Sequence, residues 1–93
     1  MLYAETPANP TCRLTDLQGL GALALALPGA VAGLAAKPLV VVDGTFASPY
    51  HQRSLEYAGV DVAIQSATKY LGGHSDLIAG SVSTLCPEVT DVI

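Results

Sequence analysis

The chain has few cations, few cysteines and no tryptophan. Only four of its 93 residues are Lys or Arg, against eight Asp or Glu, and the formal net charge is −4. A nucleic-acid partner would require a basic face, so this composition argues against one. The two cysteines, Cys12 and Cys86, lie far apart and form no C-x-x-C pair. Their spacing predicts reduced structural thiols in a cytoplasmic protein.

Recognisable targeting and membrane segments are also missing from the sequence. The first five residues, MLYAE, have no basic start and do not resemble a signal peptide. The uncharged run 19–36 approaches the length of a membrane span, but it is mostly Ala and Gly and contains Pro28. We therefore predict no membrane-spanning segment and a location in the cytoplasm.

Apolar residues are abundant, at 51% of the chain against 13% charged, with nine glycines. Such a composition is typical of the interior of a globular protein and leaves few residues for a solvated surface. A chain of 93 residues allows one small domain, which buries only a modest fraction of its surface.

The first third of the chain predicts a strand, a loop and a helix. Residues 1–5 form a short strand, which two nearby prolines end. Thr15 and Gln18 match a capping box, so a helix is expected from Asp16 to Leu27. Its apolar stripe comprises Leu17, Leu20, Ala24 and Leu27. Residues 30–36, after a Pro-Gly break, predict one or two further helical turns.

The remaining chain predicts a mostly parallel α/β sheet. The expected elements are, in order, a strand over 39–42, a loop over 44–52, a helical turn over 53–58, a strand over 60–65, a glycine-rich connection over 69–76, a strand over 78–84 and a helix starting at Pro87. The run 39–42 is continuously apolar, as in a parallel strand covered on both faces. The connection 69–76 is short for a parallel crossover, so the last strand is expected to be antiparallel.

Polar residues that could carry chemistry follow the carboxyl ends of the predicted strands, where open α/β sheets bind ligands. They are Asn9, Asp43, Ser66 and Lys69. A lysine amine in a partly dry site can lose its proton and form a Schiff base with an aldehyde. The hydroxyls of Ser66 and Thr68, with local backbone N–H groups, can hold a phosphate. An aldehyde and a phosphate on one molecule describe pyridoxal phosphate.

Three segments resemble motifs of the Cys/Met-metabolism family of pyridoxal-phosphate enzymes, the transsulfuration group. Residues 66–76 (SATKYLGGHSD) are similar to its lysine signature, residues 5–11 (ETPANPT) to its E-[ST]-P-x-N-P segment, and residues 41–49 (VVDGTFASP) to its V-D-N-T-F-x-x-P segment. One departure is Gly44, where many relatives have asparagine. The resemblance implies the large domain of the aspartate-aminotransferase-like fold, fold type I of the pyridoxal-phosphate-dependent transferases, with pyridoxal 5'-phosphate as cofactor.

The resemblance also implies a role for each site residue. Lys69 would carry the cofactor as an aldimine and then move protons at the substrate carbons. Asp43 would keep the pyridine nitrogen protonated, and Asn9 would contact the ring hydroxyl. Ser66 and Thr68 would bind the cofactor phosphate. From the residues alone, ordinary structural roles stay open: a surface lysine, a carboxylate that caps a turn, turn hydroxyls and an Asx turn.

The implied reaction is β- or γ-elimination or replacement at a C–S or C–O bond. Its substrate would be a sulfur amino acid or an activated homoserine, and the enzyme would be a homodimer or homotetramer. The family's subunits run to several hundred residues, so residues 1–93 are expected to be the central part of the large domain, without its N-terminal segment and its C-terminal small domain. The open alternative is an inactive truncated fragment that at most assembles with full-length relatives.

Other chemistries find little support in the sequence. Residues 74–76 (HSD) are adjacent in one turn and cannot generally form a Ser–His–Asp hydrogen-bond chain, and no G-x-S-x-G elbow is present. His51 has no partner at zinc-ligand spacing, so no metal site is predicted. A dinucleotide fingerprint starting at Gly19 would require glycine at position 24, which is alanine.

Overall fold

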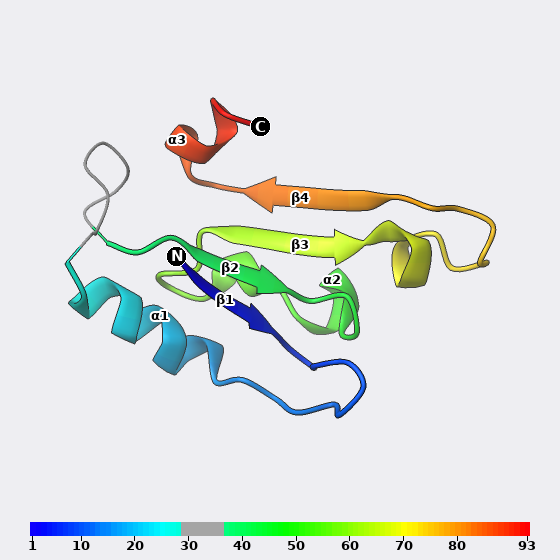
Figure 1. Cartoon of the computed structure of the whole chain (residues 1–93), viewed down its shortest axis with the longest axis horizontal. Helices are drawn as coiled ribbons and strands as arrows, with labels where there is room; N and C mark the ends of the chain where they lie inside the picture. The colour runs from blue at the N-terminus through cyan, green and yellow to red at the C-terminus, as the bar shows by residue number, and fades with distance from the viewer. Residues whose placement is uncertain (29–36) are drawn as a thin grey trace.

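The computed structural model describes residues 1–28 and 37–93, which form a mixed sheet with short helices (Figure 1). Its four strands are β1 (Leu2–Glu5), β2 (Val40–Asp43), β3 (Val62–Ser66) and β4 (Gly80–Thr84), in that spatial order. β1, β2 and β3 are parallel, and β4 is antiparallel to β3. The prediction of a mostly parallel sheet with an antiparallel last strand is confirmed.

β2 is the most deeply buried strand of the sheet. Its residues Val40 and Val42 have no exposed surface, and Val41 is 7% exposed. Because successive side chains point to opposite faces, this apolar run requires cover on both sides. The strand begins at Val40 and β3 at Val62, one and two residues later than predicted.

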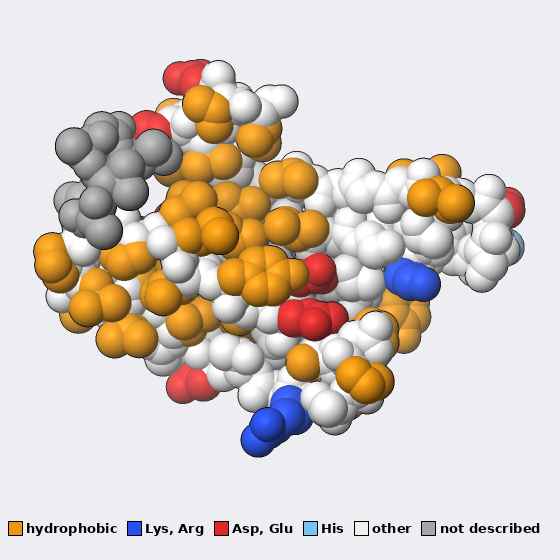
Figure 2. All heavy atoms as spheres, in the orientation of Figure 1, with side chains coloured by type: hydrophobic (Ala, Val, Ile, Leu, Met, Phe, Trp, Pro, Cys, Tyr) orange, Lys and Arg blue, Asp and Glu red, His pale blue; other side chains and the backbone are white. Residues whose placement is uncertain are grey.

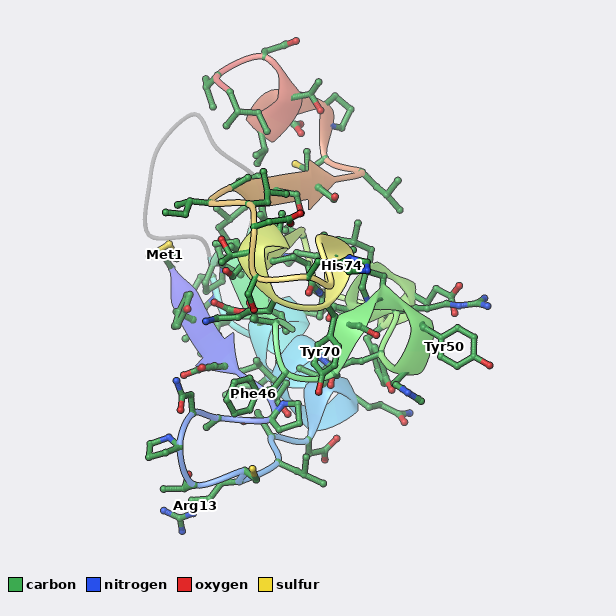
Figure 3. The ribbon with its side chains drawn as sticks, turned by 90° about the vertical axis from the view of Figure 1, so that its right-hand side faces the viewer. Met1, Arg13, Phe46, Tyr50, Tyr70 and His74 are labelled. Carbon is green, nitrogen blue, oxygen red and sulfur yellow. The ribbon has the colours of Figure 1, made fainter. Side chains whose placement is uncertain are left out.

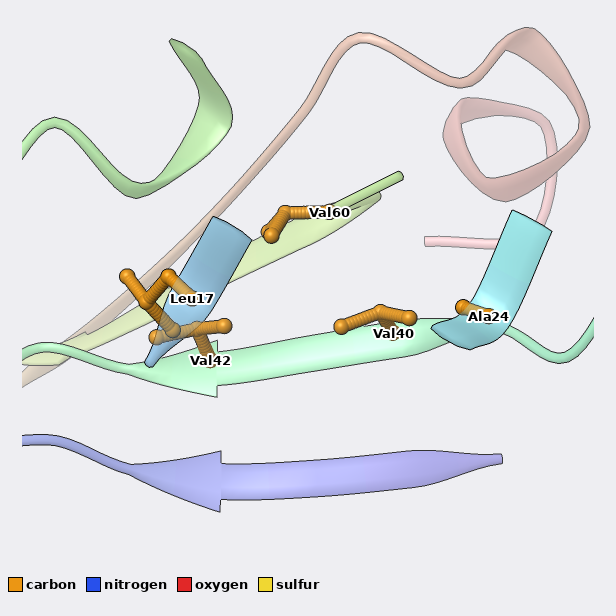
Figure 4. Close-up of a cluster of buried hydrophobic side chains, with 5 residues drawn as sticks. All are labelled: Leu17, Ala24, Val40, Val42 and Val60. Carbon is orange, nitrogen blue, oxygen red and sulfur yellow. The ribbon is translucent and has the colours of Figure 1, made fainter. Parts of the chain in front are cut away.

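Helix α1 (Leu17–Ala26) covers one face of the sheet. Its side chains pack with those of β2 and with a valine two residues before β3 in one buried cluster, which Figure 4 shows: Leu17, Ala24, Val40, Val42 and Val60. On the opposite face, Val89 of α3 (Pro87–Thr90) packs against Val41 and Val62. The sheet is therefore covered by a long helix on one side and by a single helical turn on the other.

The prediction of the cap of α1 is wrong by one residue. Asp16 is the N-cap, and its Oδ1 accepts a hydrogen bond from Gly19 N at 2.9 Å. Thr15 is held elsewhere, because its backbone N–H donates to Thr6 Oγ1 at 3.1 Å. The apolar stripe also differs: Leu27 is the C-cap, with extended backbone and 39% exposure.

Gly21 takes a place in the buried stripe of α1 because the helix lies against the backbone before β3. A Cβ at position 21 would lie 1.9 Å from the carbonyl oxygen of Ala58. Gly59 completes this contact with a φ of +89°, which a residue with a Cβ rarely adopts. Two glycines therefore let α1 approach the sheet closely.

The connections contain three more short elements. They are α2 (Ser48–His51), the 3₁₀ turn η1 (Ser54–Glu56) and the π-helical turn η2 (Ala67–Leu71). η1 and α3 confirm the predicted turn and the helix at Pro87. The loop predicted over 44–52 is wrong where α2 forms, because Pro49 in its first turn favours helical backbone. The turns predicted over 30–36 lie outside the described residues.

Two further findings bear on the sequence expectations. Cys12 and Cys86 are both free thiols, Cys12 exposed and Cys86 half-buried. Within residues 1–28 and 37–93, every helix is too short or too polar to cross a membrane.

Candidate functional site

The carboxyl ends of the parallel strands meet at one edge of the sheet, and the predicted site residues lie there. Asp43 and Ser66 are the last residues of β2 and β3, Asn9 lies in the loop after β1, and Lys69 lies in η2 directly after β3. Figure 2 shows acidic and cationic side chains on this part of the surface. Parallel pairing thus brings residues from three separate segments to one edge, where α/β sheets bind ligands.

Asp43 presents a half-buried carboxylate with one donor on each oxygen. Its Oδ1 accepts the backbone N–H of Thr45 at 2.9 Å, which makes an Asx turn over Asp-Gly-Thr. Its Oδ2 accepts the hydroxyl of Tyr3 at 3.3 Å. A carboxylate has about four lone-pair sites, so each oxygen keeps room for another donor.

Tyr3 was not among the predicted site residues. Burial raises the pKa of the Tyr3 hydroxyl, and the Asp43 carboxylate, its hydrogen bond and Glu5 raise it further. Tyr3 therefore remains a neutral hydrogen-bond donor at neutral pH. The only signal in the sequence was alternation: Tyr3 and Glu5 lie on the same face of a strand that pairs beside Asp43.

Lys69 lies in the middle of η2, where its φ of −90° and ψ of −115° interrupt the helical backbone. Its side chain is exposed, and in residues 1–28 and 37–93 its Nζ makes no salt bridge. The prediction that the Lys69 amine lies in a partly dry site is therefore not met within the described residues, because η2 lies at an open rim of the sheet. The amine is free to bond to a ligand.

An open pocket of about 820 Å³ lies beside Lys69. Thr68, Lys69 and Ser75 are among its polar residues, whereas its apolar residues include Leu14, Phe46 and Ile78. Figure 3 shows Phe46 and Tyr70, both of which line it, above the loop that carries Arg13. Asp43, Ser66 and Asn9 lie outside this pocket, so the structure divides the predicted residues between the pocket and the strand ends.

The two predicted phosphate ligands have different surroundings. The Thr68 hydroxyl donates to Ala79 O at 3.3 Å and accepts from Ala79 N at 3.1 Å. The Thr68 backbone N–H also donates to Ala79 O at 3.3 Å. These three hydrogen bonds, which we call the Thr68–Ala79 clamp, close the loop that contains Lys69. Ser66 instead is held through its backbone N–H, which donates to the buried Thr45 Oγ1 at 2.8 Å, and its hydroxyl remains available to a ligand.

Asn9 is exposed in the loop after β1, and its backbone N–H donates to Glu5 Oε1 at 3.2 Å. Glu5 thereby fixes the loop that carries Asn9. Gly44, the departure from the family pattern, is buried next to Gln65. A Cβ at position 44 would lie 2.8 Å from Gln65 Nε2, so glycine and this glutamine fit together.

The local turn around His74 does not form a catalytic triad. Its Nδ1 lies 3.0 Å from Gly72 O, within the same turn. Among the described residues, no group of three His, Cys, Asp or Glu side chains is placed to hold a metal ion.

Known sequences match this chain over nearly all its length. The sequence model of the family described as Cys/Met metabolism PLP-dependent enzyme matches residues 1–92. L-methionine gamma-lyase of Fusobacterium nucleatum subsp. nucleatum is 48% identical over 84 residues, which cover 90% of this chain and 19% of that enzyme. Cystathionine beta-lyase of Lactococcus lactis subsp. cremoris is 41% identical over 92 residues, which cover 99% and 22%.

Solved structures show the same arrangement. The crystal structure of cystathionine gamma-lyase from Lactobacillus plantarum complexed with L-serine matches with a TM-score of 0.81 at 43% identity, covering 96% of this chain and 21% of that one. Cystathionine gamma synthase from Xanthomonas oryzae pv. oryzae, in complex with aminoacrylate and cysteine, gives 0.80 at 37%, covering 96% and 20%. The chain spans about a fifth of the length of these relatives.

Proposed function

This chain belongs to the Cys/Met metabolism PLP-dependent enzymes, and from that membership we propose that it supplies the cofactor-binding lysine of an enzyme acting on sulfur amino acids or activated homoserine. The observation that carries the proposal is the position of Lys69. Its amine, without a salt-bridge partner in the described residues, projects from the turn directly after β3, at the sheet edge where Asp43 ends β2.

The residues at this edge fit pyridoxal 5'-phosphate. Asp43 has acceptor capacity left for a protonated ring nitrogen, because each carboxylate oxygen accepts only one hydrogen bond. Lys69 would hold the aldehyde carbon, and Asn9 the ring hydroxyl. Ser66 and Thr68 would hold the phosphate by donating their hydroxyl protons to its oxygens, Thr68 after its hydroxyl is released from Ala79 O.

Lys69 and Asp43 would then each have a definite task in the reaction. The bound cofactor supplies an electron sink for negative charge at the substrate α-carbon. The Lys69 amine, once the substrate amine has released it, would take a proton from one substrate carbon and return it to another or to the leaving group. The Asp43 carboxylate would accept a hydrogen bond from the proton-bearing ring nitrogen and fix the orientation of the ring.

The substrate class follows from what the relatives have in common. They are named as a methionine gamma-lyase, a cystathionine beta-lyase, a cystathionine gamma-lyase and a cystathionine gamma synthase. We infer β- or γ-elimination or replacement at a C–S or C–O bond as the shared reaction type. An amino acid substrate and a homodimeric or homotetrameric enzyme in the cytoplasm complete the proposal.

The 93 residues are proposed to be the central part of a larger cofactor-binding domain. Several large apolar side chains are exposed, among them Leu14 at 79%, Ile78 at 95% and Leu85 at 79%. Burial of such side chains normally contributes about 2 kcal/mol each, so the isolated chain lacks much of the stabilisation of a complete domain. We expect no cooperative thermal transition from the isolated 93 residues, as measured by circular dichroism. A sharp transition would contradict this part of the proposal.

Borohydride labelling of the complete polypeptide tests the proposed function. Reduction converts a reversible link between a lysine amine and an aldehyde into a stable bond, and peptide mapping then identifies the lysine. The chain contains two lysines, so Lys37 is an internal control for Lys69. The label is expected on Lys69 alone and absent from the Lys69→Ala variant. A label on Lys37, or an unlabelled colourless protein with the cofactor in excess, would refute the proposal.

The alternative is an inactive truncated fragment of such an enzyme. Such a product would at most assemble with a full-length relative. Continuous coding sequence on both sides of these residues would decide in favour of the enzyme, and stop codons directly outside them would decide in favour of the fragment.

A further inference from the structure

The hydroxyl of Tyr3 contacts the candidate cofactor ligand Asp43 from the neighbouring strand. β1 and β2 pair in parallel with Tyr3 opposite Val41 and Glu5 opposite Asp43. Side chains alternate along a strand, so Tyr3, Glu5 and Asp43 point to the same face of the sheet. The Tyr3 hydroxyl donates to Asp43 Oδ2 at 3.3 Å, across 40 residues of sequence.

We propose that Tyr3 is a positioning residue, which fixes the orientation of the Asp43 carboxylate and thereby strengthens cofactor binding. This proposal rests on the proposed function, which assigns Asp43 to the ring nitrogen. The two carboxylate oxygens are held from two different segments: Oδ1 by the Thr45 backbone at 2.9 Å and Oδ2 by Tyr3. With both oxygens held, rotation of the carboxylate is restricted, so less conformational freedom is lost when the ring nitrogen binds.

The surroundings of Tyr3 favour a donor role. The charged groups that face its hydroxyl are the carboxylates of Asp43 and Glu5, and both raise the pKa of Tyr3, after the larger effect of burial. A neutral phenol beside an ionised carboxylate donates its proton. At 3.3 Å the hydrogen bond is longer than the usual O–H···O distance of about 2.8 Å.

A role in folding alone would not account for this contact. Tyr3 is 56% exposed, and an exposed hydrogen bond stabilises a fold only slightly. The hydroxyl therefore has little to contribute to the sheet, whereas the aspartate that it contacts lies at the site. A positioning role therefore predicts that loss of the Tyr3 hydroxyl weakens cofactor binding without lowering stability, whereas a structural role predicts a loss of stability.

The first test compares Tyr3→Phe with Tyr50→Phe in the complete polypeptide. Tyr50 is a matched control, 86% exposed on α2, and Figure 3 shows it projecting from the side of the molecule. The dissociation constant of pyridoxal 5'-phosphate is expected to rise about three- to tenfold for Tyr3→Phe. For Tyr50→Phe it should change less than about twofold. The urea midpoint of the cofactor-free protein should be the same for both variants. Equal affinities for both, or a large fall in the urea midpoint with Tyr3→Phe alone, would overturn the proposal.

The second test asks whether the effect passes through Asp43. In a double-mutant cycle, Tyr3→Phe should have no further effect on cofactor affinity once Asp43→Ala is present. The cofactor-free protein gives an independent measurement, the ultraviolet titration of Tyr3 taken as the difference between wild type and Tyr3→Phe. Its midpoint is expected to fall when Asp43 is replaced by alanine. Additive effects on affinity, or an unchanged titration, would overturn the proposal.

These outcomes also separate the inference from the proposed function. If Lys69 carries the borohydride label and Asp43→Ala weakens cofactor binding while Tyr3→Phe does not, only the role of Tyr3 is refuted. If Asp43→Ala binds the cofactor as tightly as wild type, the assignment of Asp43 fails, and the role of Tyr3 fails with it.

Discussion

The two ends of the parallel strands each carry a lysine and an aspartate, but the structure uses them differently. At the amino end, Lys37 Nζ and Asp61 Oδ2 lie 2.6 Å apart, with side chains only 16% and 14% exposed. Lys37 also donates to Gly59 O at 3.1 Å, and Asp61 accepts from Val40 N at 2.7 Å. At the carboxyl end, Lys69 and Asp43 form no salt bridge within the described residues.

This difference shows that the surroundings, and not the residue type, decide what a lysine does. The amine of Lys37 forms an ion pair with Asp61 and is fully hydrogen-bonded, so it ties the segments before β2 and β3 together. Lys69 has no such partner in the part of the chain that the structure describes, so its amine stays available for covalent chemistry. Position relative to the strand distinguishes the two: one lysine precedes a parallel strand and the other follows one.

The largest expected effect concerns catalysis by the complete polypeptide. Lys69→Ala should lower kcat/KM for its amino acid substrate by about 10³-fold or more, because the proton-transfer group is lost. Lys37→Ala, assayed where it remains folded, should lower it less than about tenfold. Steady-state kinetics measures both values. Full activity in Lys69→Ala would contradict the proposal that Lys69, and not Lys37, takes part in the chemistry.

The free energy of unfolding should change more in Lys37→Ala than in Lys69→Ala, the opposite of the order expected for activity. Lys37→Ala leaves the mostly buried carboxylate of Asp61 without its cation, so the free energy of unfolding is expected to fall by about 3 kcal/mol. Lys69→Ala should change it by less than about 0.5 kcal/mol, because the side chain is exposed. Urea unfolding of the two cofactor-free variants measures the difference. A larger loss in Lys69→Ala than in Lys37→Ala would contradict the comparison.

A smaller effect is expected at high pH, from the tyrosine at the carboxyl end. The pKa of Tyr3 is raised in the folded state, so the folded protein holds this proton more tightly than the unfolded chain does. Its contribution to stability is therefore present below about pH 10 and is lost as the pH rises through the folded pKa. Between about pH 9 and pH 11, Tyr3→Phe should lose less stability than wild type, as measured by urea unfolding at each pH. Parallel curves for wild type and Tyr3→Phe would contradict the expectation.

The smallest effect concerns the two cysteines, which also lie at opposite ends. Cys12 lines the pocket at the carboxyl end, whereas Cys86 follows the antiparallel β4 and so lies near the amino end. A hydrogen bond to the Glu88 carboxylate, with a thiol–oxygen distance of 3.0 Å, raises the pKa of the Cys86 thiol. Because the thiolate is the nucleophile, iodoacetamide should alkylate Cys86 more slowly than Cys12.

Glu88→Gln provides the matched variant for this measurement. It removes the negative charge that Cys86 faces, so the alkylation of Cys86 should become faster while that of Cys12 stays the same. Mass spectrometry of the two peptides over time follows both thiols in one sample. An unchanged rate at Cys86 would show that Glu88 does not control this thiol.

The order and direction of the strands could be predicted from the sequence because they depend on local patterns. The apolar run of β2 indicates a strand buried on both faces, and the short connection before β4 allows only an antiparallel return. The cap of α1 could not be predicted in the same way. Thr15 and Asp16 are both good caps, and the choice depends on Thr6, nine residues earlier, which binds the Thr15 backbone.

For the candidate site, the sequence predicted which residues take part, and that stays a prediction, but it did not predict their surroundings. Lys69 and Asp43 belong to local motifs, whereas the contact between Tyr3 and Asp43 depends on the register of two strands. The exposure of Lys69 depends on how η2 lies at the rim of the sheet. Neither feature has a signal in the neighbouring residues, because both arise from segments that meet only after folding.

The Thr68–Ala79 clamp has a consequence for how this molecule can change over generations. Three hydrogen bonds fasten the two ends of the loop, so residues inserted near Gly73 would extend it outward while β3 and β4 keep their alignment. Lengthening a surface loop costs little free energy, about 0.6 kcal/mol for each doubling. The stretch beside the Lys69 amine can therefore acquire insertions and new contacts under selection, while the framework beneath it is inherited intact.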